Sequence, residues 1–354
     1  MGKLRIYVHL LKRGLLLFIT VVVAIYATII IVNMGGYIDE IIKSQLLEDT
    51  TNLIKRDPIY RTLTPAEQDK LIKARYESEL ERRGLNQPFI IRSLIYLKDA
   101  ITLDLGRSLY ITSNTGSRRV QTIILELLPT SVMLFTTGTV LSFIITLYLG
   151  LYLSRHRGGL LDKIVVALSP SSGIPPWLYG IVFIIIFSSY LHIFPYGGLV
   201  SVPPPNDPVL YFLDALWHMT LPLICWILSG LFLGAYGNRN YFLLFSSEDY
   251  VTVGKAKGLP ESAILRRYVL RPSSSPIILG LALGLIGSWQ GAIITETVFN
   301  WPGIGLLTNK ALTAVDTPII IGLAVTYGYL LAATEFILEI LYSYLDPRIR
   351  VLMG

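Results

Sequence analysis

Long uncharged stretches constrain this chain more than any other feature of its sequence. A helix needs about 20 mainly apolar residues to cross the hydrocarbon of a bilayer. Six stretches reach that length, at residues 14–34, 127–154, 164–191, 215–238, 272–295 and 317–344. The chain is also 53% hydrophobic and only 15% charged, a balance that soluble domains rarely show. The sequence therefore predicts an all-α polytopic membrane protein with six transmembrane helices.

The basic residues predict how this bundle is oriented. They gather before the first stretch, between the second and third, between the fourth and fifth, and after the sixth. The short connections on the other side, residues 192–217 and 299–316, contain a single basic residue, Lys310. By the positive-inside rule, both termini are predicted to be cytoplasmic. The bases at helix ends thus favour a lipid membrane over nucleic acid as the chain's surroundings, and we expect a multi-pass protein of the cell membrane.

These boundaries divide the chain into three parts. Residues 1–34 form a tail and the first helix, residues 35–126 form an extracytoplasmic helical insertion, and residues 127–354 form the core with helices two to six. Within the insertion, Thr64, Pro65 and Glu67 have the spacing of a helix start with a capping box. Gly84 is a candidate helix stop, and residues 88–103 are expected to form a further helix.

The cytoplasmic loop at residues 246–272 is dense in charge. Eight charged residues between Glu248 and Arg271 would cost about 20 kcal/mol at the centre of a bilayer, so this loop is expected to stay in water. Ser246 and Asp249 have capping-box spacing, Gly258 permits a left-handed turn, and Pro260 starts a second short helix. An apolar stripe on that helix suits docking in the groove of a soluble partner. Its members are Ile264, Leu265, Tyr268 and Val269. Spacing alone leaves a merely solvated loop as an equal alternative.

Motifs along the chain decide between these alternatives. The stretch EDYVTVGKAKGLPESAILRRYVLRP closely resembles the coupling loop of ABC importer permeases, and in particular of the oligopeptide/dipeptide (peptide/nickel) permease family. Gly254 stands where that family usually has Ala, and Pro272 also departs from its pattern. Three more stretches resemble the family in order: Asp104 to Ser108, ETVFNWPGIG at residues 296–305, and LDPRIR at residues 345–350.

The resemblance implies a subunit of a larger machine. Its implied partners are a second homologous permease, two ABC ATPases and an extracytoplasmic substrate-binding protein. No phosphate-binding GxxxxGK[ST] motif is present, so the chain is expected to be non-catalytic, with ATP and magnesium bound by the ATPases and no cofactor or metal of its own. The residues that the resemblance implies for ATPase coupling are Asp249, Tyr250, Lys255, Ala256, Lys257, Gly258, Leu259, Glu261, Arg266 and Arg267.

The translocation path is less sharply indicated. Trp289, Gln290 and Glu296 are candidates, although core or lipid packing for Trp289 and an interfacial hydrogen-bonded acid for Glu296 are alternatives. The glycines at 280, 284, 287 and 291 favour close helix packing against the partner permease or the sixth helix. The prolines at 170, 175 and 176 are expected to break the third span.

Two alternatives for function stay open at this point. Glu335 and Glu339 lie four residues apart in an apolar helix, a pattern that could also serve a proton-coupled secondary transporter. The cargo implied by the resemblance is an oligopeptide or dipeptide, with oligosaccharides as the alternative within the same family. No residue of this chain discriminates between these cargoes.

Overall fold

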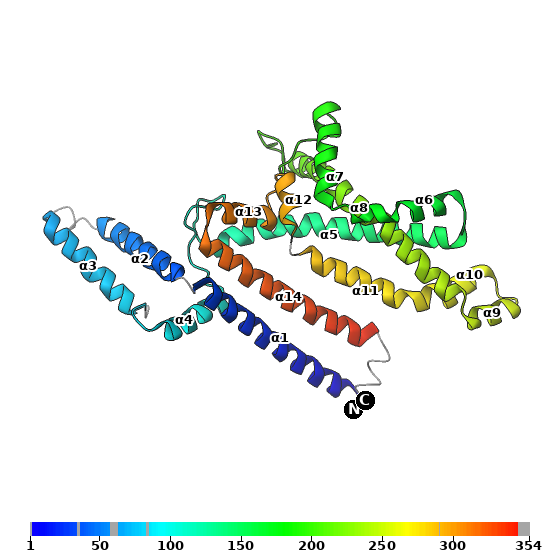
Figure 1. Cartoon of the computed structure of the whole chain (residues 1–354), viewed down its shortest axis with the longest axis horizontal. Helices are drawn as coiled ribbons and strands as arrows, with labels where there is room; N and C mark the ends of the chain where they lie inside the picture. The colour runs from blue at the N-terminus through cyan, green and yellow to red at the C-terminus, as the bar shows by residue number, and fades with distance from the viewer. Residues whose placement is uncertain (1, 34–35, 57–62, 83–84, 290, 346–354) are drawn as a thin grey trace.

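The fold is all-α, as the sequence predicts. A computed structural model describes residues 2–33, 36–56, 63–82, 85–289 and 291–345 (Figure 1). In these ranges the structure contains helices and no strand beyond one isolated bridge between Arg107 and Arg119. The α-helices are α1 (Gly2–Asn33), α2 (Tyr37–Arg56), α3 (Pro65–Arg82), α4 (Phe89–Ile101), α5 (Val120–Arg155), α6 (Leu160–Leu168), α7 (Pro176–Phe183), α8 (Pro208–Ser246), α9 (Asp249–Ala256), α10 (Glu261–Ile264), α11 (Arg271–Ser288), α12 (Ile293–Val298), α13 (Ile304–Ala314) and α14 (Thr317–Leu345).

Among the described residues, five helices are long and apolar enough to cross a membrane, and a bent pair brings the number to six if it counts as one span. The bent pair joins Leu160–Gly173 to Pro176–Tyr190 at an angle of 98°. The predicted prolines explain the bend. Pro175 and Pro176 have no N–H groups, so the helical hydrogen-bond ladder cannot continue through them.

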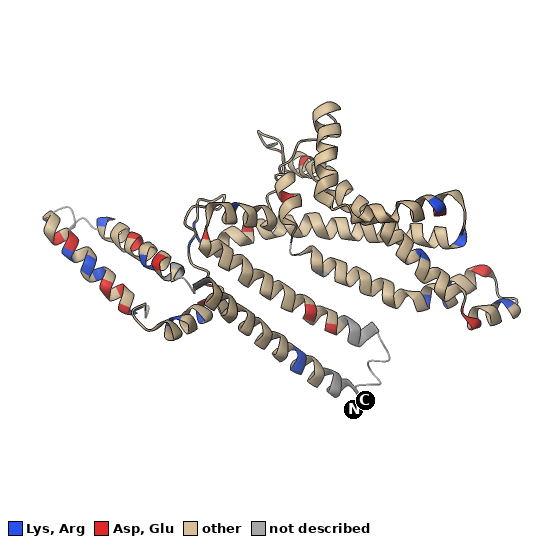
Figure 2. Ribbon diagram, viewed as in Figure 1, with Lys and Arg blue, Asp and Glu red and all other residues tan. Residues whose placement is uncertain are grey.

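The centre of the bundle is the pair α5 and α8, which pack along their lengths (Figure 1). Glycines let the two helices approach closely: a Cβ at Gly138 would lie 2.7 Å from Trp226, and one at Gly150 would lie 2.6 Å from Asn238. On one side, α14 packs against α1 through Val21, Ile25, Ile29 and Val325. Charged side chains are sparse on these long helices and concentrate on α2 and α3 and around α9 and α10 (Figure 2).

The outer insertion contains more helix than the sequence indicates. The expected helix at 88–103 is present as α4, while α2 occupies a region for which the sequence gives no pattern. The capping box of α3 forms in part: Glu67 accepts hydrogen bonds from the N–H and the hydroxyl of Thr64 at 2.9 and 2.6 Å. These two bonds lower the pKa of the Glu67 carboxyl. Gly84 lies outside the described residues.

The fifth span differs from its prediction at both ends. A single run of helix from Glu261 to Leu285 passes the length and hydropathy test for a span, so it begins within the loop at residues 246–272 rather than at Pro272. Residues Leu265–Leu270 form a π-helical segment that leads directly into α11. At the other end α11 stops at Ser288, and Gly291 has a φ of +69° that a continuous helix cannot contain. Residues 293–298 then form the separate helix α12.

Candidate functional site

The loop between α8 and α11 is the first part of the site. α9 ends at Ala256, and Gly258 follows with a φ of +71°, the left-handed conformation that its sequence position predicts. Its N–H donates to the Lys255 carbonyl at 2.9 Å, and Pro260 then precedes α10. The predicted cap at Ser246 is wrong, because α8 continues through Ser246 and the Ser246 hydroxyl donates back to Leu243.

One face of this loop packs against the rest of the chain. Val251, Ile264 and Val269 are buried in a cluster with Phe242 of α8 and Ile277 of α11. Leu265 and Tyr268 pack against the same cluster. The expectation that this apolar stripe docks in a partner's groove is therefore wrong. The chain's own helices α8 and α11 bury these apolar side chains, and this packing holds the loop against the end of the bundle.

The opposite face of the loop is exposed. Tyr250 and Val253 are 38% and 51% exposed on α9, large values for an aromatic and a branched side chain. Burial and the nearby charge of Glu248 raise the pKa of the Tyr250 phenol, so it is a neutral hydroxyl at neutral pH. The other predicted coupling residues are exposed as well, apart from the half-buried Leu259: Asp249, Lys255, Ala256, Lys257, Gly258, Glu261, Arg266 and Arg267. The loop thus exposes these charged residues together with the larger side chains of Tyr250 and Val253.

A second polar cluster lies beyond the far end of α11 and is centred on Glu296. Its side chain is completely buried, and one carboxylate oxygen accepts a hydrogen bond from the Ser131 hydroxyl of α5 at 2.8 Å. The other oxygen accepts from the N–H of Leu306 at 3.1 Å, in the first turn of α13. Ser131 in turn accepts from the N–H of Ile304 at 2.7 Å. One acid therefore ties α5, α12 and α13 together.

Glycines form the cradle around this acid. A Cβ at Gly291 would lie 2.7 Å from the Glu296 carboxylate, and a Cβ at Gly303 would overlap both Glu296 and Ser131. At Gly305, a Cβ would lie 2.9 Å from the backbone of Ile293. The spacing of the WPGIG stretch thus has a local physical cause: two glycines let the start of α13 approach the carboxylate and the backbone of α12. The buried Trp301 fixes the turn by donating its indole N–H to the Thr130 carbonyl at 3.1 Å.

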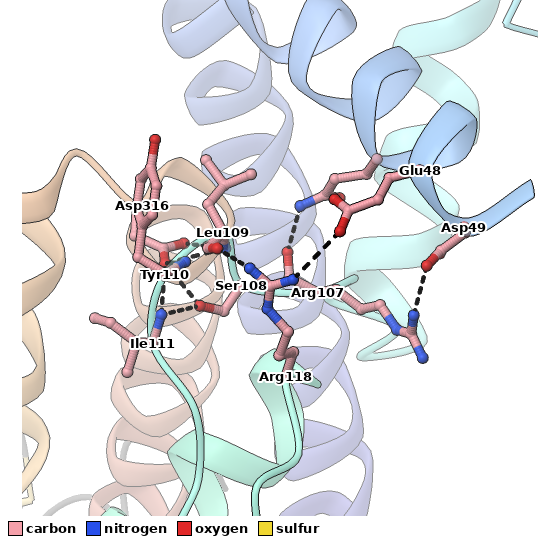
Figure 3. Close-up of polar contacts among 10 residues, drawn as sticks. Glu48, Asp49, Arg107, Ser108, Leu109, Tyr110, Ile111, Arg118 and Asp316 are labelled. Carbon is pink, nitrogen blue, oxygen red and sulfur yellow. Dashed lines mark hydrogen bonds and ion pairs between the residues drawn. The ribbon is translucent and has the colours of Figure 1, made fainter. Parts of the chain in front are cut away.

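A third cluster joins the outer insertion to the core (Figure 3). The buried Asp316, between α13 and α14, accepts hydrogen bonds from the Ser108 hydroxyl at 2.6 Å and from the Tyr110 N–H at 2.9 Å. On the outer side of the same loop, Arg107 pairs with Asp49 of α2 at 2.7 Å. The loop is therefore held by α14 on one side and by α2 on the other.

Comparison with known proteins shows to which family this chain belongs. Residues 146–351 match the family described as "Binding-protein-dependent transport system inner membrane component". The chain belongs to this family. The matched region begins within α5 and includes the loop with Gly258 and the Glu296 cluster, so both of these sites lie in the family's shared region.

Individual relatives agree with the family match. The permease is 31% identical to a probable D,D-dipeptide transport system permease protein of Escherichia coli strain K12, over 79% of this chain and 86% of the relative. It is 27% identical to an oligopeptide transport system permease protein of Bacillus subtilis, over 83% of this chain and 89% of the relative. The predicted resemblance to dipeptide and oligopeptide permeases is confirmed. The chain is a multi-pass plasma-membrane permease component of an ABC importer.

Two of the three predicted path residues of this permease lie in the described ranges. Trp289 is half-buried in the turn after α11, and Gln290 lies outside the described residues. Glu296 is completely buried, so in this structure its carboxylate is a hydrogen-bonded structural group and faces no passage. Of the predicted packing glycines in α11, only Gly284 lies close to another helix: a Cβ there would lie 3.0 Å from Thr139 of α5. Gly280 and Gly287 face open space.

Several residues that position these sites in the permease have no clear signal in the sequence. Asp316 stands before Thr-Pro at the start of α14, which is typical of a local helix cap, yet it binds a loop more than 200 residues earlier. Asp162 of α6 is 4% exposed and forms a bidentate ion pair with Arg239 of α8, at 2.5 and 2.9 Å. Glu339 pairs with His9 and Arg13 of α1 at 2.8 and 3.5 Å, so it ties α14 to α1.

Proposed function

We propose that this permease forms half of the translocation path for oligopeptides or dipeptides. A second, homologous permease would supply the other half, two ATPases would bind on the cytoplasmic side, and a substrate-binding protein would deliver cargo from outside. Family membership supports ATPase and binding-protein partners, and the names of the relatives favour peptides over oligosaccharides as cargo. An ABC permease draws its energy from ATP, which argues against proton coupling through Glu335 and Glu339.

The observation that carries the coupling role is the exposed face of the loop at residues 246–272. Its inner face is buried against α8 and α11, so a force applied to the outer face reaches both helices. Its outer face presents Tyr250 and Val253 among charged side chains, as an interface with a soluble partner requires. We infer that the ATPases dock here and that their closure moves α8 and α11.

In this proposal the chain itself carries out no chemistry. ATP and its magnesium ion would be bound and hydrolysed by the partner subunits, and this chain would need neither a cofactor nor a metal. The permease would then contribute binding surfaces and a two-state gate whose equilibrium the ATPases bias.

Replacement of Gly258 by Val tests the coupling role. A branched side chain at a φ of +71° costs about 1–2 kcal/mol, so the turn after α9 should shift. The open space around Gly258 means that no neighbouring side chain needs to move, so the fold should persist. In proteoliposomes that contain the whole complex, we expect peptide uptake per ATP hydrolysed to fall by about tenfold or more, with normal membrane insertion.

Gly237→Val is the matched control. Gly237 lies within α8, also has open space around it, and has an ordinary helical conformation. This variant should couple normally. Normal uptake per ATP by Gly258→Val would contradict the coupling role. A wild-type complex that transports oligosaccharides and no peptide would contradict the proposed cargo alone.

A further inference from the structure

A cavity in the described part of the chain is lined by α7, α8, α14 and the segment at residues 291–295. Its volume is about 770 Å³, within the range of small-molecule sites. Trp226 lies midway along α8, and Tyr327 and Gly328 lie near the middle of α14, so this cavity is at membrane depth. The remaining walls come from the start of α7, with Pro176 and Trp177, and from the segment at 291–295.

Two interruptions of helix meet at this cavity. One is the 98° bend that ends at Pro176, and the other is the break between α11 and α12, where Gly291 has a φ of +69°. Non-helical backbone at membrane depth leaves polar groups without helical partners. It is tolerated only where protein buries it or where it borders water. Because neither break could face lipid, the open side of this cavity borders water or a second protein chain.

The wall of this cavity is aromatic and uncharged. No Asp, Glu, Lys or Arg is among its described lining residues, which include two indoles and a phenol. Trp226 is held rigidly: its ring packs against Phe135 with centroids 4.6 Å apart, and its edge lies over Gly138. The Tyr327 hydroxyl is 3.2 Å from the Thr308 hydroxyl, which fixes the phenol as well. Rigid aromatic plates of this kind bind apolar and aromatic groups by stacking and area burial.

The segment at 291–295 is also held rigidly, because it leads directly into the Glu296 cluster. Glu296 forms hydrogen bonds with α5 and α13, and Gly305 lets α13 lie against the backbone of Ala292 and Ile293. By contrast, Trp177 stands in the first turn of α7, immediately after the bend, and is only half-buried. The cavity therefore combines fixed walls with one aromatic side chain at a bend.

We propose that this cavity is a cargo subsite on the passage, which receives an uncharged apolar or aromatic side chain of a transported peptide. Trp177 and Trp226 form its stacking walls, and Trp177 determines how well such a side chain is accepted. This inference rests on the proposed peptide import and adds a preference that acts after the binding protein has released its cargo.

Cysteine labelling tests whether the cavity contains water. Cys225 is the only cysteine of the chain and is buried, so Cys225→Ala gives a background for single-cysteine variants. Leu331→Cys places a thiol in the cavity wall, and Val23→Cys places one midway along α1, where Val23 is 60% exposed on the outside of the bundle. In the whole complex, we expect a charged methanethiosulfonate reagent to modify position 331 at least tenfold faster than position 23. Equal rates at the two positions would overturn the proposal.

Uptake of two probe peptides tests the preference. The whole complex is reconstituted with saturating, preloaded binding protein, and import of Ala-Phe-Ala is compared with import of Ala-Ala-Ala. In Trp177→Ala we expect the ratio of Ala-Phe-Ala to Ala-Ala-Ala uptake to fall about tenfold, because a lost apolar contact changes selectivity by that order. Trp177→Phe should restore most of the ratio. Leu178→Ala, at a neighbouring exposed position that does not line the cavity, should leave it unchanged.

The outcomes separate this inference from the proposed function. A wild-type complex that imports neither peptide contradicts peptide cargo, while the labelling at position 331 still decides whether the cavity is aqueous. Import of both peptides with a ratio that Trp177→Ala does not change contradicts the subsite and leaves peptide import standing.

Discussion

The continuous helical run that begins at Glu261 and ends with α11 is flanked on both sides by a glycine in the left-handed conformation. At one end the chain turns at Gly258 with a φ of +71°, and at the other it turns at Gly291 with a φ of +69°. A Cβ at Gly258 would meet no atom within 4 Å outside its own chain neighbours, whereas a Cβ at Gly291 would lie 2.7 Å from the buried Glu296 carboxylate. One turn is surrounded by open space, and the other is filled by a hydrogen-bonded acid.

This difference indicates how a span can transmit movement. The exposed turn leaves room for a partner to push on it, and the buried cluster holds the far end of α11 against α5 and α13. If the ATPases move the Gly258 end, the Glu296 end serves as the fixed point. The cavity walls at residues 291–295 lie beside that fixed point, so a small tilt of α11 would change the passage there.

Truncation of the buried acid should have the largest effect on stability. Glu296→Ala leaves the Ser131 hydroxyl and the Leu306 N–H without their acceptor, at a cost of about 3 kcal/mol. Glu261→Ala removes an exposed acid at the start of α10, the opposite end of the same helical run, and should change stability by less than about 0.5 kcal/mol. Thermal unfolding of the purified complexes measures both. Similar unfolding temperatures for the two variants would remove the contrast between the ends of this helical run.

Alanine at the two turn glycines should have intermediate effects that differ in size. Each substitution places a side chain in the left-handed region, at a cost of about 1 kcal/mol. Gly291→Ala also crowds the Glu296 carboxylate, and overpacking by one methyl group adds about 1 kcal/mol. We therefore expect Gly291→Ala to be clearly less stable than Gly258→Ala in the same unfolding assay. Equal destabilisation would mean that the cluster relaxes around the new methyl group.

The sequence predicts the local chemistry of the Gly258 turn well. Gly258, Pro260 and the start of α10 at Glu261 follow from rules that act over a few residues, and the structure has each of them. The long uncharged helices are equally predictable, because the bilayer requires a minimum apolar length. The bend in the third span follows from its prolines.

Contacts between distant segments are what the sequence does not predict. Nothing near Glu296 in the sequence indicates that Ser131, 165 residues earlier, is its hydrogen-bond partner. From the sequence alone, Glu296 is therefore as good a candidate for the passage as for a structural acid. The stripe with Ile264 and Val269 has the pattern of a docking helix, and only the positions of Phe242 and Ile277 show that the chain buries it itself. The aromatic cavity likewise draws on four segments, whose meeting depends on the bend at Pro176.

Charge reversal on the exposed loop should have the smallest effect on stability and a clear effect on assembly. Arg266 and Arg267 are exposed in the same loop as Gly258, so Arg266→Glu together with Arg267→Glu should change the free energy of unfolding by about 0.5 kcal/mol or less. We expect retention of the ATPases during purification to fall about tenfold, and to fall more at low salt, where screening is weak. Lys73→Glu on the outer helix α3 also reverses an exposed base and should retain the ATPases normally. Loss of ATPases from both variants would show that overall charge decides assembly, whereas loss from the loop variant alone assigns the ATPase contact to the Gly258 end of α11.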